Sequence, residues 1–360
     1  MLKKISVALA AIMVVASAAA QKIGLRPKLT QKNAFSMIVI PDVQNYVKFQ
    51  CNQPILDLMT TWVVNNMDSL NIKTVLCTGD LVDRNNSLVA KRKNMDQTSK
   101  QMWQATSRAF SFLDGVLPYV VCTGNHDYGL YETAINRESQ MPNYFYPDRN
   151  RCWQKSIVDV GLNAFGQPTL ENAAYEIETG SPKWGKLLVL SLEFAPSDSV
   201  LEWAKEVVSK PKYKNTFVIV LTHSFLDKFG NLKQKEDYKV TDANYGQAIW
   251  DKLIYPAKNI RMVVCGHVCS LEGYDRQVSF RSAKNSAGKT VAQMMFNAQT
   301  ADGAWAGNGG DGWLRILEFE PDGHTIGVRT FSPLFAVSKI TCDKAWRTAS
   351  YDQFTIELDK

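Results

Sequence analysis

The sequence predicts an α/β protein, a four-layer αββα sandwich with two mixed sheets at its core. Short apolar runs alternate with segments of helical periodicity over about residues 36–265, and this alternation predicts parallel strands joined by right-handed crossovers. From about residue 276 to the end, apolar and polar residues alternate with a period of two, which indicates consecutive antiparallel strands. Both sheets are therefore expected to be mixed.

The first part of the chain has the order strand, helix, strand, helix, strand. Each expected strand is a run of apolar residues, and each expected helix has apolar residues at spacings of three and four. Pro54 suits the first turn of the first helix. The expected ranges are strand 36–40, helix 54–70, strand 73–77, helix 95–113 and strand 118–121.

Residues 128–183 interrupt this order, because they are rich in aromatic and turn-forming residues. We interpret them as an insertion beside the strand ends. The alternation then resumes with strand 187–192, helix 197–208, strand 217–221, helix 245–254 and strand 261–265. The later strands are expected at 276–281, 291–296, 313–319, 325–330 and 354–358.

The N-terminus has the features of a secretory signal peptide. Lys3 and Lys4 precede an apolar run over 5–15, and small residues follow as far as Ala20. The run is shorter than the ~20 residues that a membrane span needs. We therefore expect cleavage after Ala20, export to the periplasm or the medium, and a single domain over residues 21–360 with no membrane span.

Charge and cysteine content limit the class of protein further. The formal net charge of +6 is small and scattered, so the sequence does not indicate a nucleic-acid partner. Seven cysteines in an exported chain raise the question of disulfides. Two of Cys51, Cys152 and Cys342 could pair, and the sequence does not say which. The oligomeric state is also left open.

Polar side chains follow five of the expected strands at the point where each strand ends. In chain order they are Asp42, Asp80, Asn125 with His126, His223 and His267. Open α/β folds place their sites at the carboxyl ends of strands. Carboxylate, imidazole and amide groups together suit ions of the Zn, Mn or Fe type, so these strand ends predict a metal site.

The five strings resemble the motifs of the calcineurin-like metallophosphoesterases, which read D-x-H, G-D-x-x-D, G-N-H-D, a lone His and G-H-x-H. Here they are Asp42-Val43-Gln44, Gly79 to Asp83, Gly124 to Asp127, His223, and Gly266 to Cys269. The resemblance spans about residues 34–270. The stretches 297–299 and 309–315, together with D-x-Q in place of D-x-H, also resemble exported bacterial members of this superfamily.

The resemblance implies a centre of two divalent or mixed-valence ions bridged by Asp80. Asn125, His223 and His267 would complete the second site, and Asp42 belongs to the first. At the two remaining positions of the first site the family has histidines, whereas this chain has Gln44 and Cys269. An amide oxygen is a weaker ligand than imidazole, and Cys269 either binds as a thiolate or packs without binding. The chain is thus expected to bind either two ions or one.

The resemblance also implies metal-assisted hydrolysis of a phosphoester, with in-line attack of an activated water on phosphorus. His126 would donate a proton to the leaving oxygen, and Asp127 would orient His126. The substrate is a small-molecule or surface phosphoester, and phosphatase and phosphodiesterase activity are both open. The alternative is a catalytically degenerate binding or scaffold protein of the same fold, because two histidines are replaced.

Overall fold

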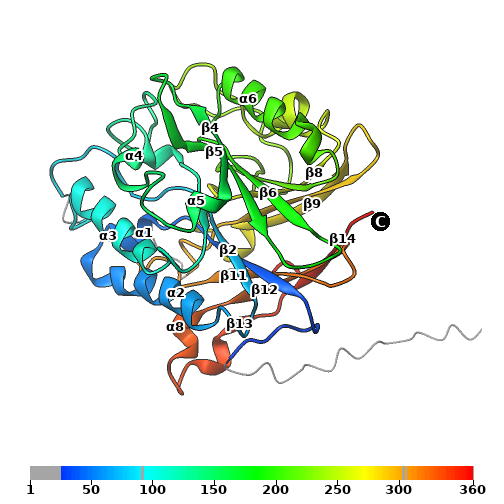
Figure 1. Ribbon diagram of the computed structural model, residues 1–360. Helices are drawn as coiled ribbons and strands as arrows, with labels where there is room; N and C mark the ends of the chain where they lie inside the picture. The colour runs from blue at the N-terminus through cyan, green and yellow to red at the C-terminus, as the bar shows by residue number, and fades with distance from the viewer. Residues whose placement is uncertain (1–25, 91–92, 302–304, 306, 360) are drawn as a thin grey trace, which may run out of the picture.

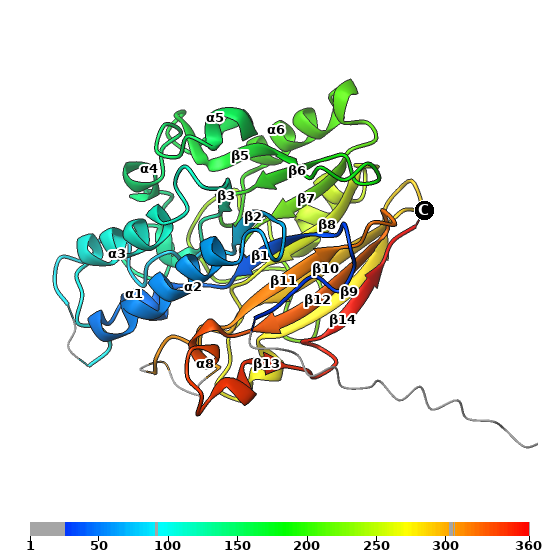
Figure 2. The same ribbon diagram turned by 60° about the horizontal axis from the view of Figure 1, so that its bottom comes forward.

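Two mixed sheets pack face to face and carry helices on their outer faces (Figures 1 and 2). This computed structural model describes residues 26–90, 93–301, 305 and 307–359. Within these residues each sheet has seven strands. The predicted α/β sandwich is confirmed. The predicted signal peptide, residues 1–20, lies outside the described residues.

Sheet A has the strand order β13-β12-β11-β1-β2-β3, and β14 also pairs with β12. Strands β1, β2 and β3 are parallel, whereas β11 runs antiparallel to β1. The sheet therefore joins the first strands of the chain to the last. Its strands are β1 Phe35–Ile40, β2 Ile72–Cys77, β3 Tyr119–Val121, β11 Leu314–Phe319, β12 Thr325–Phe331, β13 Trp346–Arg347 and β14 Phe354–Glu357.

Sheet B has the order β4-β5-β6-β7-β8-β10-β9. Strands β6, β7, β8 and β10 are parallel, and β9 forms an antiparallel edge beside β10. Strands β4 and β5 come from the segment 128–183, for which the sequence predicted no strands. The bounds are β4 Ile157–Leu162, β5 Pro168–Glu178, β6 Lys186–Ser191, β7 Phe217–Leu221, β8 Ile260–Cys265, β9 Val278–Lys284 and β10 Thr290–Phe296.

Helices α2 and α3 lie beside sheet A, and α6 lies on the outer face of sheet B (Figure 2). Side-chain caps set two helix starts: Thr98 caps α3 in a capping box, and Ser197 caps α6. Helix α3 therefore starts at Ser99, four residues later than predicted. The helices are α1 Gln44–Val47, α2 Gln53–Asn65, α3 Ser99–Ser111, α4 Met141–Tyr144, α5 Trp153–Ser156, α6 Asp198–Ser209, α7 Gly246–Ile249 and α8 Pro333–Ala336.

The parallel strands are buried on both faces, which explains why they read as continuous apolar runs. In β7, Ile219 and Leu221 point into the core between the sheets, whereas Val218 and Val220 pack with the residues of α6. Full burial of such a side chain contributes about 1.5–3 kcal/mol. These contacts hold the carboxyl ends of the strands in place.

All seven cysteines are free, so Cys51, Cys152 and Cys342 do not pair. Cys77, Cys122 and Cys265 are buried in or directly after strands, as the sequence predicted. Among the helices formed by the described residues, none has the length and apolar character needed to cross a bilayer.

Candidate metal centre

The five predicted strand ends meet at one place between the two sheets. Sheet A supplies the residues that follow β1, β2 and β3, and sheet B supplies those that follow β7 and β8. Each polar residue lies two to four positions after the last residue of its strand, so its side chain is held close to the strand end. The residues brought together are Asp42, Asp80, Asn125, His223 and His267.

Four of these side chains place one ligand atom each in a compact group. His223 Nε2 lies 3.3 Å from Asp80 Oδ2 and 3.3 Å from Asn125 Oδ1. His267 Nδ1 lies 3.0 Å from Asn125 Oδ1 and 3.1 Å from His223 Nε2. Ligand atoms that share one ion at ~2.1 Å are separated by about 3.0–3.4 Å. The spacing of this group fits a single bound metal ion.

Hydrogen bonds on the outer side of each imidazole fix which nitrogen faces the group. His223 Nδ1 lies 2.7 Å from the carbonyl oxygen of Thr78, and His267 Nε2 lies 2.8 Å from Glu236 Oε2. In the neutral ring each of these outer nitrogens carries the hydrogen, so the inner nitrogen presents a lone pair. Such outer partners are what orient metal-binding histidines.

Asn125 is oriented in the same way, because its Nδ2 donates to the carbonyl oxygen of Glu132 at 2.7 Å. Its Oδ1 is thereby turned toward the imidazoles and the carboxylate of Asp80. Unless His223 Nε2 carries a proton, four electron-rich atoms face one another with no hydrogen between them, and the raised pKa of His223 shows that this group attracts positive charge. A divalent cation relieves this repulsion, so these residues fit a metal ion.

Asp42 lies beside this group and is held by three donors. Its Oδ1 accepts from Thr78 Oγ1 at 2.7 Å, and its Oδ2 accepts from the His267 amide at 2.9 Å and from Asn297 Nδ2 at 2.7 Å. Asp42, Asp80 and His223 each offer a ligand atom, all within 4.8 Å of one another. Asp42 therefore supplies a carboxylate on the side of the centre where a first ion would lie.

Burial and neighbouring charges perturb the pKa values of these groups strongly. Burial raises the pKa of Asp42 to about 7 against the opposing charge of His223. Burial acts in the same direction on Asp80, but the charges of His223 and His126 outweigh it and hold the pKa of Asp80 below its usual range. The charges of Asp80 and Asp42 in turn outweigh burial and raise the pKa of His223 to about 10. Such coupled groups are typical of functional sites.

Glycines leave the space that the two carboxylates occupy. A Cβ atom at Gly124 would lie 2.0 Å from Asp80 Oδ1, and one at Gly266 would lie 2.1 Å from Asp42 Oδ1. Asp80 and His267 themselves have positive φ angles, 48° and 72°, which are uncommon for residues other than glycine. The motif glycines are therefore required by close approach at the centre, and two ligand candidates carry backbone strain.

Gln44 and Cys269 occupy the two positions where the sequence departs from the motif. Gln44 Nε2 donates to Asp80 Oδ2 at 2.9 Å, and its Oε1 is buried with no hydrogen-bond partner. Cys269 is not part of the Asp42, Asp80 and His223 group, which is the one such cluster of ligand atoms in the described part of the chain. Burial raises the pKa of its thiol, although Lys48 opposes this, so the thiol stays protonated.

His126 lies next to the centre, in the short helical turn Asn125–Asp127. Its backbone amide donates to Asp80 Oδ1 at 3.0 Å, and its Nε2 lies 4.0 Å from Asp80 Oδ2. The ring is oriented by the carbonyl oxygen of Asp83, 2.7 Å from Nδ1. Burial lowers the pKa of His126, but the charges of Asp80 and Asp83 outweigh it and raise that pKa.

The side chain of Asp127, for which the sequence predicted contact with His126, instead binds backbone amides. Its Oδ2 accepts from Gly124 at 2.8 Å and Leu81 at 3.1 Å, and its Oδ1 accepts from Val82 at 3.1 Å. Asp127 thus ties together the loops after β2 and β3. It acts on the site by holding Asp80 and His126 in their relative positions.

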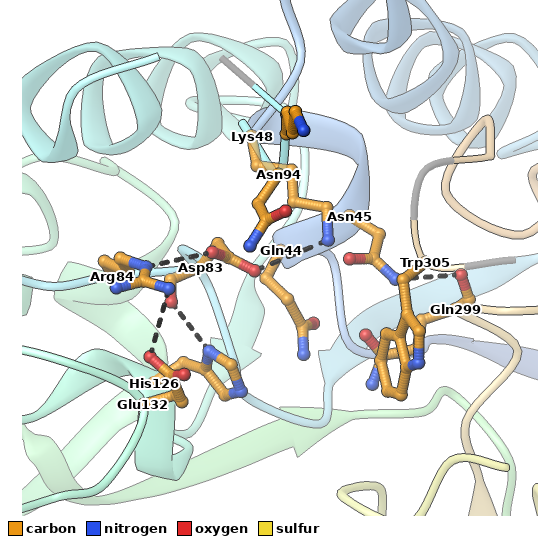
Figure 3. A pocket seen from close by; sticks show the side chains of 11 residues that line it. Gln44, Asn45, Lys48, Asp83, Arg84, Asn94, His126, Glu132, Gln299 and Trp305 are labelled. Carbon is orange, nitrogen blue, oxygen red and sulfur yellow. Dashed lines mark hydrogen bonds and ion pairs between the residues drawn. The ribbon is translucent and has the colours of Figure 1, made fainter. Parts of the chain in front are cut away.

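A cavity of about 420 Å³ opens beside the centre (Figure 3). Asn45, Gln299 and Trp305 lie on one side, Arg84, Asp83, His126 and Glu132 lie on the other, and Gln44 lies between them (Figure 3). Trp305 was not singled out by the sequence, and neither was Glu132. His126 lines this cavity, so a ligand in the cavity can reach it.

Three residues at the centre had little or no sequence signal. Glu236 and Thr78 orient the two histidines through hydrogen bonds, but neither stands in a motif position. Asn297, which contacts Asp42, lies in a stretch that carried a loose resemblance. A lone Glu in a loop, or a Thr after a strand, becomes informative only when the fold shows what it touches.

Comparison with known proteins supports this reading. The family model of the calcineurin-like phosphoesterases matches residues 36–271. The protein YvnB of Bacillus subtilis (strain 168), described as uncharacterized, is 24% identical over 332 residues. That alignment covers 91% of this chain and 22% of YvnB, so the chain spans about a fifth of the length of that relative.

Two solved structures are similar at 11% identity. GAP50, the anchor in the inner membrane complex of Plasmodium, gives a TM-score of 0.44 over 91% of this chain and 90% of its own. PhoD gives a TM-score of 0.40 over 90% of this chain and 73% of its own. The family assignment rests on the family model. Its match covers most of the chain and includes every residue of the centre from Asp42 to His267. The chain belongs to the calcineurin-like phosphoesterase family.

Proposed function

We propose that the protein is a metal-dependent phosphoester hydrolase that acts outside the cytoplasm. The observation that carries the proposal is the group formed by Asp80, Asn125, His223 and His267, whose inner atoms lie 3.0–3.3 Å apart with their outer atoms already bonded. The export part of the proposal rests on the signal-peptide features of residues 1–20.

These four residues would hold the second of the two ions that the resemblance implies, and the carboxylate of Asp80 would also serve the first. Asp42 would hold the first ion, and Gln44, whose Nε2 bonds Asp80 and whose Oε1 is buried without a hydrogen-bond partner, could supply a further oxygen. When bound, such ions supply Lewis-acid activation of a water and of the phosphoryl oxygens. The protein would therefore work with two ions, or with one if Gln44 and Cys269 do not replace the missing histidines.

His126 is the proposed proton donor to the leaving group. Its raised pKa favours the imidazolium form, in which Nδ1 donates to Asp83 and Nε2–H points toward the centre and the cavity. In the reaction, the water oxygen bonds to phosphorus and the bond from phosphorus to the ester oxygen breaks. The Nε2 proton goes to that oxygen, and the proton that the water releases to solvent restores His126.

The test combines metal analysis with a panel of substrates. Purified protein should contain one or two equivalents of a divalent metal and should hydrolyse p-nitrophenyl phosphate or bis-p-nitrophenyl phosphate. His126→Ala should retain the metal and lose activity by about 10²–10⁴-fold, whereas Asp80→Ala should lose both. Metal-loaded protein that is inert toward a broad range of phosphomonoesters and diesters would refute the proposal.

Two observations favour a second candidate, a binding or scaffold protein without turnover. Gln44 donates a hydrogen bond to Asp80 through Nε2 and does not turn its oxygen toward the centre. Burial raises the pKa of the Cys269 thiol, so the thiol stays protonated. A double variant, Gln44→His with Cys269→His, discriminates between the two. If it gains a phosphoesterase activity that the native chain lacks, the native centre is catalytically degenerate.

A further inference from the structure

The cavity beside His126 has more positive than negative side chains in its walls. Among the described residues that line it, the cations and the carboxylates are Lys48, Arg84, Lys93, Asp83 and Glu132. This set leaves one positive charge in excess before any charge on His126 or at the metal centre is counted. A cleft with an excess of one sign of charge raises the local concentration of ligands of the opposite sign. The cavity therefore suits an anionic group.

Two of these cations are largely buried, yet their side chains donate no hydrogen bond to any described residue. The side chains of Lys48 and Arg84 are 7% and 13% exposed, and Lys48 Nζ lies 3.6 Å from Asp83 Oδ1. Arg84 Nε lies 3.6 Å from Asp83 Oδ2, and Arg84 Nη2 lies 3.6 Å from Glu132 Oε2. Hydrogen bonds between charged groups are shorter, ~2.7–2.9 Å. A buried donor that lacks an acceptor is costly, so these side chains indicate a ligand that supplies acceptors.

The terminal nitrogens of both side chains can be reached from the cavity, which both residues line (Figure 3). Arg84 Nε is fully buried, whereas Lys48 Nζ and the two Nη atoms of Arg84, which also lack hydrogen-bond partners, are not. The ring of Tyr131 covers one face of the guanidinium, with its centroid 5.1 Å from Arg84 Cζ, and leaves the edge free. Burial lowers the pKa of Lys48 although the charge of Asp83 opposes this, so an anion here would stabilise the ammonium form.

The two cations are grouped around Asp83, on the Nδ1 side of His126 and not on the Nε2 side. His126 Nε2 faces the centre, 4.0 Å from Asp80 Oδ2, whereas Nδ1 lies 2.7 Å from the carbonyl oxygen of Asp83. The carboxylate of the same Asp83 lies between Lys48 and Arg84 (Figure 3). A phosphoryl group at the centre would meet Nε2 of His126, so an anion that Lys48 and Arg84 hold is a different group of the substrate.

We propose that the leaving group of the substrate carries a second anionic group, a phosphate or a carboxylate, which Lys48 and Arg84 bind. The two Nη atoms of Arg84 would donate parallel hydrogen bonds to it, and Lys48 Nζ would donate another. Lys93, exposed at the rim, would attract the anion toward the cavity. The proposal rests on the proposed function, because the leaving oxygen must receive its proton from His126. The substrate is then a phosphoester with a negative charge at the far end of its alcohol.

The test compares pairs of phosphoesters that differ only in the charge at the far end of the alcohol. The ω-phosphooxyalkanoates from the propanoate to the hexanoate are compared with the corresponding amides, so that no length of the leaving group is assumed. If only diesters react, the methyl diesters of the same compounds are used. At the best length, kcat/KM for the carboxylate should exceed that for the amide by about tenfold or more. Bisphosphates of the matching diols then show whether the cavity prefers a phosphate to a carboxylate.

Matched variants assign the preference to the two cations. Lys48→Met and Arg84→Met each remove one charge, and each should lower kcat/KM for the anionic ester about tenfold more than for the amide ester. Arg84→Lys keeps the charge and should retain part of the preference. Lys205→Met is the control and should alter neither value, because Lys205 also pairs with a carboxylate, that of Glu202, but lies on α6 and does not line the cavity.

The negative results have different meanings. If the metal-loaded protein hydrolyses no phosphoester, the proposed function fails and this inference fails with it. If esters are hydrolysed but the charged and amide forms react equally at every length, the inference alone is overturned. It is also overturned if Lys48→Met and Arg84→Met slow both forms equally, since that result would place the two cations at the scissile phosphate. Thermal unfolding of each variant shows whether it is folded under the assay conditions.

Discussion

Glu236 contributes to the centre through a single side chain, His267. Its Oε2 lies 2.8 Å from His267 Nε2, and its other oxygen accepts a hydrogen bond from Ser224. The hydrogen bond and the charge of His267 outweigh burial and lower the pKa of Glu236 to about 2, so it is a carboxylate at neutral pH. Glu236 thus orients His267, a candidate ligand, and it lies in a loop that contains no motif.

Removal of Glu236 should weaken metal binding without abolishing the fold. We expect Glu236→Ala to raise the Kd for Mn²⁺ or Zn²⁺ about 10–100-fold, because the His267 ring loses its fixed orientation. Glu236→Gln keeps an acceptor and should have a smaller effect. Competition with a chromophoric chelator measures Kd directly.

The exposed Glu202 of α6 provides the control, since Glu202→Gln makes the same change of charge far from any imidazole. Equal Kd values for Glu236→Ala and the native protein would show that His267 needs no outer partner or is not a ligand.

Asp127 should matter for stability at least as much as for catalysis. Asp127→Ala leaves the buried amides of Leu81, Val82 and Gly124 without acceptors, at about 1–3 kcal/mol each. We expect the free energy of unfolding, measured in urea, to fall by roughly 3–6 kcal/mol. The exposed Asp148 is the control, and a loss below about 1 kcal/mol in Asp127→Ala would contradict this role.

At the scale of single residues, the sequence predicted which side chains gather, because each follows a buried strand directly and so lies at the carboxyl end of that strand. It did not predict their partners. Asp127 was expected beside the ring of His126, but the ring is held by a backbone carbonyl, that of Asp83. Every residue has a backbone carbonyl, so the amino-acid sequence does not indicate which carbonyl will accept a hydrogen bond.

Among the elements, the loop after β3 is held to the end of β6 by Arg137. Its guanidinium donates to Glu193 Oε1 at 3.0 Å and to the carbonyl oxygens of Phe194 and Ala195. This loop also carries Glu132, whose carbonyl orients Asn125. The contact of Arg137 with Glu193 therefore supports the metal centre from outside it.

The burial of Glu193 should make stability depend on pH. Burial raises the pKa of Glu193 to about 7 despite the opposing charge of Arg137. The unfolded value is about 4.3, so between these values the folded state holds a proton that the unfolded state has lost. Stability should fall as pH rises from about 4.5 to 7, by on the order of 1 kcal/mol per pH unit from this group.

Urea unfolding at several pH values tests this, and Glu193→Gln should flatten the slope over that range. Glu206→Gln, at an exposed position of α6, should leave the slope unchanged. A native slope that persists in Glu193→Gln would assign the pH dependence to other groups.

Most strands could be predicted because they are buried on both faces and carry unbroken apolar runs, as β7 does. The segment 128–183 could not be read in this way. Strand β5 contains Glu171 and Asn172, which are buried by hydrogen bonding rather than by apolar contact, so its pattern does not resemble a core strand. The antiparallel pairing of consecutive strands β9 and β10 is confirmed, but β11 does not continue from β10, because it pairs with β1 in the other sheet.

At the scale of the whole molecule, the candidate ligands come from both sheets. Asp42, Asp80 and Asn125 follow strands of sheet A, whereas His223 and His267 follow strands of sheet B. A bound ion would therefore join the two sheets. Chelation should therefore destabilise the entire fold. At a metal concentration 100 times Kd, binding contributes about 2.7 kcal/mol, which corresponds to a Tm shift of about 5 °C in a domain of this size.

Differential scanning fluorimetry with and without EDTA measures this shift. Asp80→Asn should show no response to EDTA, because it lacks the carboxylate that both proposed ions share. A native Tm that does not change on chelation would mean that no ion links the sheets.

The pairing of β1 with β11 has a consequence for how the chain reaches its fold. Phe35 in β1 pairs with Phe319 in β11. Strand β1 is synthesised early, so it cannot form this pairing until β11 has been synthesised near the end of the chain. Contacts between such distant residues slow folding, and until β11 emerges β1 has an open edge exposed to other chains. A chain cut at residue 271, where the family match ends, would keep the candidate ligands and lack this neighbour. We therefore expect a chain ending at residue 271 to expose this edge of β1 and to aggregate more readily than the full chain.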